Sequence, residues 1–224
     1  MRVVTGEAKG RKLKGPKTSG TRPIMERVKQ ALFNILSIQV EDARFLDLFA
    51  GTGSVGIEAL SRGAASATFI EMNAKVLALV RENLQITGLS DRAETLQADA
   101  FKFLQNANQP SQPGPNAHIH THTHSYMHSG APYDIIYVAP PQYQEMAARA
   151  LGLLDSSPLV AEAGLVIVQI HPKERPAVAA IPLTRLMLTD ERRYGSTLLL
   201  FYRGSPSQGN QKEPIIHVDT ITET

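Results

Sequence analysis

The clearest pattern in the chain is a series of short apolar runs that alternate with segments of helical periodicity from residue 45 onward. Five runs predict buried strands: FLDLFA (45–50), ATFIEM (67–72), AETLQAD (93–99), YDIIYVA (133–139) and GLVIVQI (164–170). Between the first three, SVGIEALSRG and NAKVLALVRENLQITG predict helices that end at Gly63 and Gly88. Such alternation is typical of a mostly parallel sheet with helices on both faces.

The pattern changes near the end of the chain. Residues 185–203, RLMLTDERRYGSTLLLFYR, contain two apolar runs separated by a Gly-Ser turn. Two runs joined in this way predict an antiparallel hairpin, which would complete the sheet.

A further helix is predicted before the first strand, with Thr21 as its cap and Pro23 in its first turn. Its apolar face is predicted to hold Val28, Leu32, Ile35 and Leu36, and its polar face Arg27, Lys29 and Gln30.

Charge is distributed unevenly. The chain has a net charge of +2, but residues 1–30 contain nine basic and two acidic residues, so that the remainder is acidic. A basic end on an acidic body favours binding to a polyanion, although a solvated terminus has the same composition. RVV and RKLKG can pair as a short hairpin that turns between Gly6 and Gly10. We therefore expect a basic arm at residues 1–22 and one main domain at 23–204.

Two segments fall outside this scheme. Residues 205–224 are polar and predict a loose tail. Residues 105–132 form a low-complexity, His-rich insertion, in which His118, His120, His122 and His124 alternate. Alternating histidines can bind a divalent metal. This segment enters the fourth strand at its amino end, however, whereas open α/β sheets bind ligands at the carboxyl ends of their strands. We therefore predict no metal site.

Composition is that of a globular protein, with 42% hydrophobic and 20% charged residues in 224. No apolar run reaches the roughly 20 residues that span a bilayer, and the amino terminus has no signal-peptide core. Cysteine is absent, which excludes disulfides and thiolate chemistry. A cytoplasmic location without membrane contact is expected.

Candidate chemistry lies at the turn after the first predicted strand. DLFAGTGSVG places Gly51, Gly53 and Gly56 in G-x-G-x-x-G register between a strand and a helix, and Glu71 follows 20 residues after Gly51. This spacing is also the fingerprint of dinucleotide binding, so that NAD is one candidate ligand.

Asp47 favours another ligand. It precedes the glycines, where its charge would repel a pyrophosphate but suit the cationic ammonium and sulfonium groups of S-adenosylmethionine. Glu71 can accept from ribose hydroxyls, Asp99 from an adenine amine, and Phe101 can pack near the ring. Three acids at the ends of consecutive strands have no evident structural role, because unpaired carboxylates there only cost desolvation.

Several motifs occur together in the order typical of one family. TRPIMERVKQALFNIL, FLDLFAGTGSVGIEALSRGA, ENLQITGL, QADAF, YDIIYVAPPQY and RRYGSTLLLFYR resemble bacterial 16S rRNA guanine-N2 methyltransferases of the RsmD type. The resemblance covers residues 1–204 except the His-rich insertion. It implies an α/β, Rossmann-like sheet of seven strands, mostly parallel with an antiparallel C-terminal hairpin, and transfer of a methyl group to the exocyclic amine of a guanine.

The same resemblance implies roles for individual residues. The expected cofactor-binding residues are Asp47, Phe49, Ala50, Gly51, Thr52, Gly53, Glu71, Met72, Asp99, Ala100 and Phe101. The expected RNA-binding residues are Arg11, Lys12, Arg22 and Arg27. The implied partner is ribosomal RNA or the 30S particle, and a monomer is expected.

One motif departs from the family. The family signature is Asp-Pro-Pro followed directly by Tyr or Phe, whereas this chain has Ala139, Pro140 and Pro141, with Gln142 inserted before Tyr143. A guanine amine must be oriented and must lose a proton during methylation. The carbonyls of Ala139 and Pro140, fixed by the two prolines, and the amide of Gln142 are the expected acceptors.

Other side chains near this motif have further expected roles. Tyr143, or Gln142 if the insertion does not shift the chain, is expected to hold the target base by stacking, unless Tyr143 simply packs on the sheet. Asp134 lies roughly 16 Å away along an extended strand and cannot replace the acid. Glu145 begins the next helix, so that its reach is undetermined.

The departure leaves alternatives open. An active RNA methyltransferase is the main interpretation. The others are a cofactor-binding assembly factor that has lost catalysis, a methyltransferase that acts on DNA adenine or a small molecule, and an NAD-dependent dehydrogenase, which Asp47 disfavours.

Overall fold

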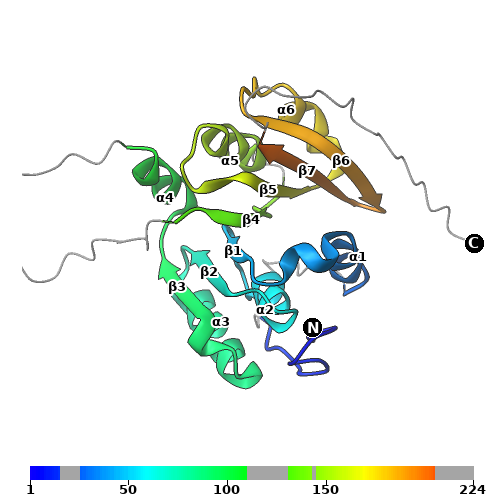
Figure 1. Cartoon of the computed structure of the whole chain (residues 1–224), viewed down its shortest axis with the longest axis vertical. Coiled ribbons are helices and arrows are strands. Elements are labelled where there is room, and N and C mark those ends of the chain that lie inside the picture. Colours follow the sequence, from blue (N-terminus) through cyan, green and yellow to red (C-terminus); the bar gives the residue numbers. More distant parts are fainter. Residues whose placement is uncertain (16–25, 110–130, 143–144, 205–224) are drawn as a thin grey trace, which may run out of the picture.

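The computed structural model describes residues 1–15, 26–109, 131–142 and 145–204 of the chain, and its centre is one twisted sheet (Figure 1). Seven strands pair in the order β3-β2-β1-β4-β5-β7-β6. Their bounds are β1 Arg44–Asp47, β2 Ser66–Glu71, β3 Ala93–Gln97, β4 Tyr133–Val138, β5 Val160–Ile170, β6 Leu186–Tyr194 and β7 Thr197–Gly204. The first five strands are parallel, and β7 is antiparallel to both β5 and β6. The predicted sheet and its final hairpin are therefore confirmed.

Helices cover both faces of the sheet (Figure 1). The bounds are α1 Glu26–Leu36, α2 Ser54–Ser61, α3 Ala74–Thr87, α4 Ala100–Ala107, α5 Met146–Asp155 and α6 Arg175–Ala179, with short 3-10 turns at Ser37–Val40, Ser90–Arg92 and Pro172–Glu174. The first three helices share one apolar cluster with the sheet, and the last three share the other.

Successive strand residues point to opposite faces, both covered by helices, which is why the central strands β1 and β4 are buried at most positions. Phe45 and Ile135 belong to the cluster under α1, α2 and α3, whereas their neighbours Leu46 and Ile136 belong to the cluster under α4, α5 and α6. A strand that is buried on both faces needs apolar side chains at nearly every position.

Some boundaries differ from the prediction. Strand β1 ends at Asp47, so that residues 48–50 already belong to the turn. Helices α4 and α6 were not predicted, and α4 extends to Ala107, into the region expected to be low-complexity. The expected helix start at Thr21 and Pro23, the four alternating histidines and the tail at 205–224 lie outside the described residues.

The predicted N-terminal hairpin is confirmed. Arg2 and Lys12 form an antiparallel bridge, and the N–H of Val3 donates to the carbonyl of Arg11. Val3 and Leu13 are buried in the same cluster as α1, α2 and α3. The hairpin therefore packs on the main sheet and its helices.

The prediction for Lys29 is wrong. Instead of lying on a polar face of α1, its side chain is only 2% exposed and pairs with the fully buried Glu58 of α2 at 3.0 Å. The ammonium also donates to the carbonyl of Arg2 at 2.8 Å. Burial lowers the pKa of Lys29, and the charge of Glu58 opposes that shift. Lys29 is therefore buried because Glu58, 29 positions later in the chain, supplies its counter-charge.

Glu58 joins three parts of the structure. Its carboxylate accepts from the backbone N–H groups of Val4 and Thr5 in the hairpin, at 2.8 and 3.0 Å, and from Arg62 one helical turn later. With Lys29 included, every oxygen of this buried carboxylate is hydrogen-bonded. The hairpin, α1 and α2 are therefore held at one charged centre.

No helix in the described part of the chain is long and apolar enough to cross a bilayer.

Replacing Glu58 tests this centre. Glu58→Gln leaves the buried ammonium of Lys29 without its counter-charge, so that we expect the free energy of unfolding to fall by about 3 kcal/mol. Urea denaturation followed by circular dichroism measures the change. The matched control is Glu82→Gln, which removes the exposed pair with Lys14 and should cost less than about 1 kcal/mol. Equal losses in the two variants would contradict the role given to Glu58.

Candidate functional site

A cavity of about 570 Å³ opens at the carboxyl ends of the parallel strands. Strand β1 pairs with β2 on one side and with β4 on the other. The chain therefore continues from β1 to β2 toward one end of the sheet and later returns from β3 to β4 on the other side of β1. Open α/β sheets bind ligands at such a reversal. The turn after β1, the ends of β2 and β4, and the start of α4 line the cavity.

The glycine loop forms the floor of this cavity. Gly51 and Gly53 have φ values of 53° and 75°, which side chains with a Cβ rarely adopt. Gly56 has a different role, since a Cβ there would lie 2.4 Å from Cε1 of Phe69 in β2. Two glycines therefore shape the turn, and the third lets α2 pack closely on the sheet.

The three acids predicted at this edge are present, but the expectation that they lack structural partners is wrong. Asp47 Oδ2 accepts from the N–H of Gly56 at 3.1 Å. Glu71 accepts from Gly51 N–H at 3.1 Å and, with its other oxygen, from Asn73 N–H at 2.8 Å. One oxygen of Asp99 caps α4 by accepting from two backbone N–H groups. Each carboxylate therefore also shapes the loop that carries it.

Asp47 is the most deeply buried of the three. Its side chain is 2% exposed, and burial raises its pKa to about 7, with a smaller contribution in the same direction from the charge of Glu71. The hydrogen bond from Gly56 opposes the shift. A cation in the cavity would favour the ionised form of Asp47, because it would offset the cost of burying the charge.

Aromatic rings form one wall. Phe49 and Phe101 meet edge to face with centroids 5.9 Å apart. The guanidinium of Arg149 in α5 lies 4.0 Å from the centroid of Phe101. Both rings line the cavity and supply an apolar surface for a flat ligand.

The diproline corner closes the other side. Ala139 is half-buried, Pro140 is buried, and Pro141 and Gln142 are exposed, and all four line the cavity. Tyr143 lies outside the described residues. Asp134 accepts from Arg44 N–H at the opposite end of the strands, as its sequence position predicted. Glu145 directly precedes α5 without a capping hydrogen bond from its side chain, is exposed and does not line the cavity.

Most of the residues expected to bind the cofactor line this one cavity. Those that do are Asp47, Phe49, Ala50, Gly51, Thr52, Glu71, Met72, Asp99, Ala100 and Phe101. Gly53 is not among the lining residues and instead begins α2. Tyr137, Met146 and Gln169 also line the cavity but were not expected. A glutamine within the apolar run GLVIVQI was the available signal for Gln169.

The N-terminal hairpin reaches the glycine loop. Asn83 of α3 is fully buried, and its amide nitrogen donates to the carbonyls of Thr52 and Lys14 at 3.0 and 3.1 Å. Lys14 N–H donates back to the Asn83 oxygen at 2.8 Å. A single amide therefore connects the basic arm with the turn under the cavity.

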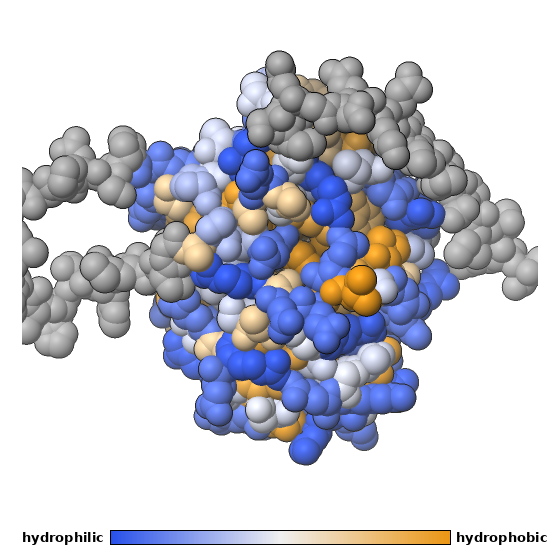
Figure 2. Space-filling view, viewed as in Figure 1, coloured by the Kyte–Doolittle hydropathy of each residue, from blue (hydrophilic) through white to orange (hydrophobic). Residues whose placement is uncertain are grey.

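Some of the basic charge in the arm is neutralised by acids of the structure. Arg2 pairs with Glu26, and Lys14 pairs with Glu82. Lys9, Arg11, Lys12 and Arg27 are exposed, whereas Arg22 lies outside the described residues. In Figure 2 the face over α2, α3 and the hairpin is mostly hydrophilic.

A further arginine lies beside Arg27. The side chain of Arg193, near the end of β6, is exposed and donates to the carbonyl of Gly195 at 3.3 Å. A Cβ on Gly195 would lie 3.8 Å from the guanidinium of Arg27. Because β6 runs parallel to β5, this turn lies at the same edge of the sheet as the cavity. Arg193 was not singled out from the sequence.

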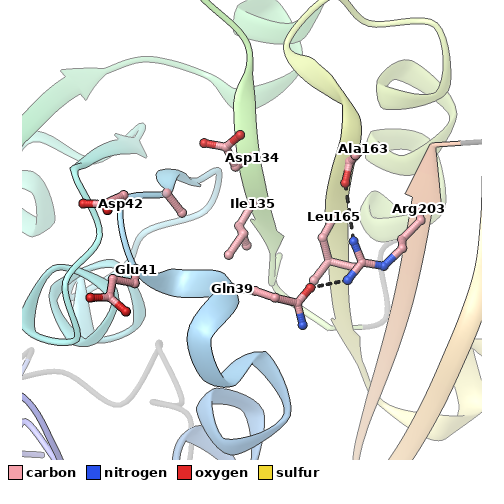
Figure 3. Close-up of a pocket in the computed structure, with 9 residues that line it drawn as sticks. Gln39, Glu41, Asp42, Asp134, Ile135, Ala163, Leu165 and Arg203 are labelled. Atoms are coloured by element: carbon pink, nitrogen blue, oxygen red, sulfur yellow. Dashed lines mark hydrogen bonds between the residues drawn. The ribbon is translucent and has the colours of Figure 1, made fainter. Parts of the chain in front are cut away.

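A second cavity, of about 380 Å³, lies at the opposite edge of the sheet. Figure 3 shows Glu41, Asp42 and Asp134 around it, with the guanidinium of Arg203 directed at Gln39 and at the carbonyl of Ala163. Its acidic lining disfavours a polyanionic ligand. Within the described residues, no group of three or more His, Cys, Asp or Glu side chains is arranged to hold a metal ion.

Comparison with known proteins supplies a family. Residues 1–114 match the family model described as "Conserved hypothetical protein 95". The chain is 33% identical over 169 residues to "Ribosomal RNA small subunit methyltransferase D" of Escherichia coli (strain K12), a match that covers 75% of this chain and 74% of that protein.

Solved structures have the same fold. The structure described as "Putative methyltransferase yhhF from Escherichia coli" is similar with a TM-score of 0.71 and 29% identity, covering 92% of this chain and 99% of that one. An RNA methyltransferase from Salinibacter ruber in complex with S-adenosyl-L-homocysteine has a TM-score of 0.55 and 12% identity, covering 87% of this chain and 99% of that one. The second likeness concerns the fold alone.

The raised pKa of Asp47 predicts a pH dependence of stability. Between its unfolded value near 3.8 and its folded value near 7, the folded state retains a proton that the unfolded state has lost. The free energy of unfolding therefore falls with rising pH across this window, by at most about 1.4 kcal/mol per unit from this group.

Asp47→Asn removes this contribution. We expect urea denaturation between pH 4.5 and pH 8 to give a steeper loss of stability in the unmodified protein than in the variant. Parallel pH profiles for the two proteins would show that Asp47 ionises in the folded state as readily as in water.

Proposed function

Because the chain belongs to the Conserved hypothetical protein 95 family, together with ribosomal RNA small subunit methyltransferase D, we propose that it methylates the exocyclic N2 amine of a guanine in small-subunit ribosomal RNA. S-adenosylmethionine is the proposed donor. The proposal includes action as a monomer in the cytoplasm, on free 16S rRNA or on the 30S particle.

The observation that carries the proposal is the charge of the cavity of about 570 Å³ at the carboxyl ends of the parallel strands, called the carboxyl-end cavity below. Asp47, Glu71 and Asp99 line it, whereas no lysine or arginine is among its described lining residues. A dinucleotide would bring its pyrophosphate against three carboxylates without a basic side chain to offset them. A cationic nucleoside without phosphate suits the same lining.

The residues of the cavity fit this donor. When bound, S-adenosylmethionine supplies a methyl group already activated on a positively charged sulfur. Glu71 is suited to accept from the ribose hydroxyls, and Asp99, which caps α4 through Oδ1, has Oδ2 for the adenine amine. Phe101 offers a flat apolar surface to the base, and Asp47 is ionised more readily beside a cation.

The surroundings of the cavity support a nucleic-acid substrate. The hairpin that carries Arg11 and Lys12 contacts the glycine loop through Asn83. Arg27 and Arg193 lie near the Gly195 turn at the same edge. Exposed arginines and lysines on both sides of a cavity are suited to contact phosphates while a base enters it. These residues, with Arg22, are the proposed RNA contacts.

The diproline corner is the proposed seat of the target amine. The carbonyls of Ala139 and Pro140 are held by two consecutive prolines, and the amide oxygen of Gln142 is exposed at the rim of the cavity. Two of these oxygens would accept hydrogen bonds from the two N–H groups of the amine and orient its nitrogen toward the methyl group. The transfer would break the methyl–sulfur bond and leave S-adenosylhomocysteine, and the proton lost by the amine would pass to water. Tyr143 is proposed to stack on the flipped base.

A second function is favoured by one observation. The side chain at the start of the diproline corner is that of Ala139, which cannot accept a proton. A protein that binds the donor and RNA during ribosome assembly without methyl transfer would have the same cavity. A methyltransferase that acts on another amine, such as that of DNA adenine, is also compatible with this corner.

Labelling of RNA tests the function. We expect the protein to transfer label from S-adenosylmethionine to undermodified 16S rRNA or 30S particles, and mass spectrometry to map the label to N2 of one guanine. Calorimetry should give a clear signal with S-adenosylhomocysteine and none with NAD. Donor binding without transfer would favour the assembly factor, label on adenine would favour another amine, and binding of NAD alone would contradict the donor assignment.

Substitutions at the diproline corner test the proposed roles. Gln142→Ala should lower the rate of methyl transfer about fivefold, since one neutral hydrogen bond to the amine is lost. Tyr143→Ala should lower it by about 5- to 150-fold, since about 1–3 kcal/mol of base stacking is lost. Ala139→Asp should leave the rate similar or raise it. Rates measured at saturating donor separate these effects from donor binding, and unchanged rates in all three variants would exclude the corner as the active site.

A further inference from the structure

Gln169 is the polar side chain nearest in register to Ala139. The last paired positions of β4 and β5 are Val138 and Val168. Ala139 and Gln169 are the next residues in the same register, so that they lie beside each other and face the same side of the sheet. Gln169 lies in an otherwise apolar part of β5 and lines the carboxyl-end cavity together with the diproline corner. The amide of Gln169 therefore lies next to Ala139, whose side chain is only a methyl group.

Tyr137 holds this amide in place. The buried phenol donates to Oε1 of Gln169 at 2.6 Å, a short and well-formed hydrogen bond. Burial, with a further contribution from the charge of Asp47, raises the pKa of Tyr137 well above its ordinary value, so that the phenol keeps its proton at any working pH. A phenol that stays protonated remains a donor and keeps the amide oxygen directed toward it.

Asp47, Tyr137 and Gln169 form a polar row on three neighbouring strands. Asp47 of β1 is paired in register with Tyr137 of β4, and the phenol reaches Gln169 of β5. All three line the cavity. The row thus runs from the glycine loop to the diproline corner, between apolar strand residues such as Phe45, Ile135 and Ile167 on the same face of the sheet.

The amide of Gln169 has bonding capacity left for a ligand. A carboxamide oxygen has two lone pairs and its nitrogen two hydrogens, and Tyr137 uses one lone pair. The nitrogen of Gln169 is not among the buried polar atoms that lack a partner in the described part of the chain. Gln169 is half-buried and lines the cavity, so that a ligand in the cavity can approach its amide.

A target amine at the diproline corner needs an acceptor of this kind. The lone pair of an exocyclic amine is delocalised into the base, and hydrogen bonds accepted from its N–H groups direct the lone pair toward the methyl group. The side chains of Ala139, Pro140 and Pro141 have no polar atoms, and Gln142 is exposed at the rim. Gln169 offers an acceptor that is fixed from within the fold.

We propose that Gln169, oriented by Tyr137, accepts a hydrogen bond from the exocyclic amine of the target base and supplies the side-chain acceptor that position 139 lacks. Gln169 is then a residue that touches the substrate, and Tyr137 is a positioning residue. This inference rests on the proposed function, since it names the group that reads the amine in the same site.

The test compares two RNA probes that differ by one amine. The first is a synthetic hairpin that carries the guanine mapped by the labelling experiment, and the second has inosine, which lacks the 2-amino group, at that position. Affinities are measured by fluorescence anisotropy in the presence of S-adenosylhomocysteine, so that the readout is binding and not turnover. If the mapped base is adenine, the pair is adenosine and purine riboside.

We expect the unmodified protein to bind the amine-bearing probe about fivefold more tightly than the probe without it, the effect of one neutral hydrogen bond. Gln169→Leu should reduce this ratio to about one, and Tyr137→Phe should reduce it in part, because the amide remains but is no longer held. Gln169→Glu keeps an acceptor oxygen and should retain a preference for the amine. Gln85→Leu, an exposed glutamine of α3, is the matched control and should keep the full ratio.

Two results would overturn the inference while leaving the proposed function intact: a full ratio in Gln169→Leu, or a ratio of one in a protein that methylates the mapped base. Affinity for S-adenosylhomocysteine within twofold of the unmodified protein shows that Gln169→Leu still forms the cavity. If that variant does not fold, the partial loss in Tyr137→Phe decides the question, and an unchanged ratio there excludes the positioning by Tyr137. Failure of the proposed function would be seen separately, as the absence of any labelled base.

Discussion

The cavity at the carboxyl ends of the strands depends on the parallel pairing of β1 with both β2 and β4. Parallel strands end at the same edge of a sheet. The strand order reverses direction between β1 and β4, so that the loops after these two strands border a shared space. The glycine loop, Glu71 and the diproline corner are thus brought to one cavity, although they are separated by up to 90 positions in the chain. The apolar composition of the strands stabilises this arrangement, because both faces of the sheet are covered by helices.

Buried polar groups fix the parts of the structure that apolar packing leaves adjustable. Glu58 holds the N-terminal hairpin and α1 against α2 through Lys29 and two backbone N–H groups. Asn83 holds the same hairpin against the carbonyl of Thr52 in the glycine loop. Such groups are directional, and each would be costly to leave unpaired. The position of the basic arm relative to the cavity is therefore determined by a few polar contacts, which suits a protein that must present a nucleic acid to a small site.

The acids around the cavity combine two roles that the sequence alone does not separate. Asp99 caps α4, and Glu71 binds the backbone of Gly51 and Asn73, so that each carboxylate shapes the loop next to which a ligand would bind. Asp47 differs, because burial raises its pKa to about 7, so that both its protonated and its ionised form are accessible near neutral pH. Its charge state is therefore sensitive to what occupies the cavity, and it is coupled through register to Tyr137 and from there to Gln169. Ala139 lies beside Gln169 at the end of this polar row, and the proposed role of Gln169 would compensate for the missing acid at position 139.

Features that depend on local pattern follow directly from the order of residues in the chain. Apolar runs and helical periods predict the strands, the helices α2 and α3 and the final hairpin, since side-chain period and turn glycines act over a few residues. The glycine spacing and the acids at the strand ends likewise predict the cavity and most of its lining. The burial of Lys29 could not be predicted in this way, because its partner Glu58 is on another helix. The placement of Gln169 beside Ala139 could not be predicted either, because it depends on the register between β4 and β5. The protonation of Asp47 likewise depends on the tertiary structure, because burial in the folded protein raises its pKa. These properties depend on distances and burial between segments far apart in the chain, which a local pattern does not encode.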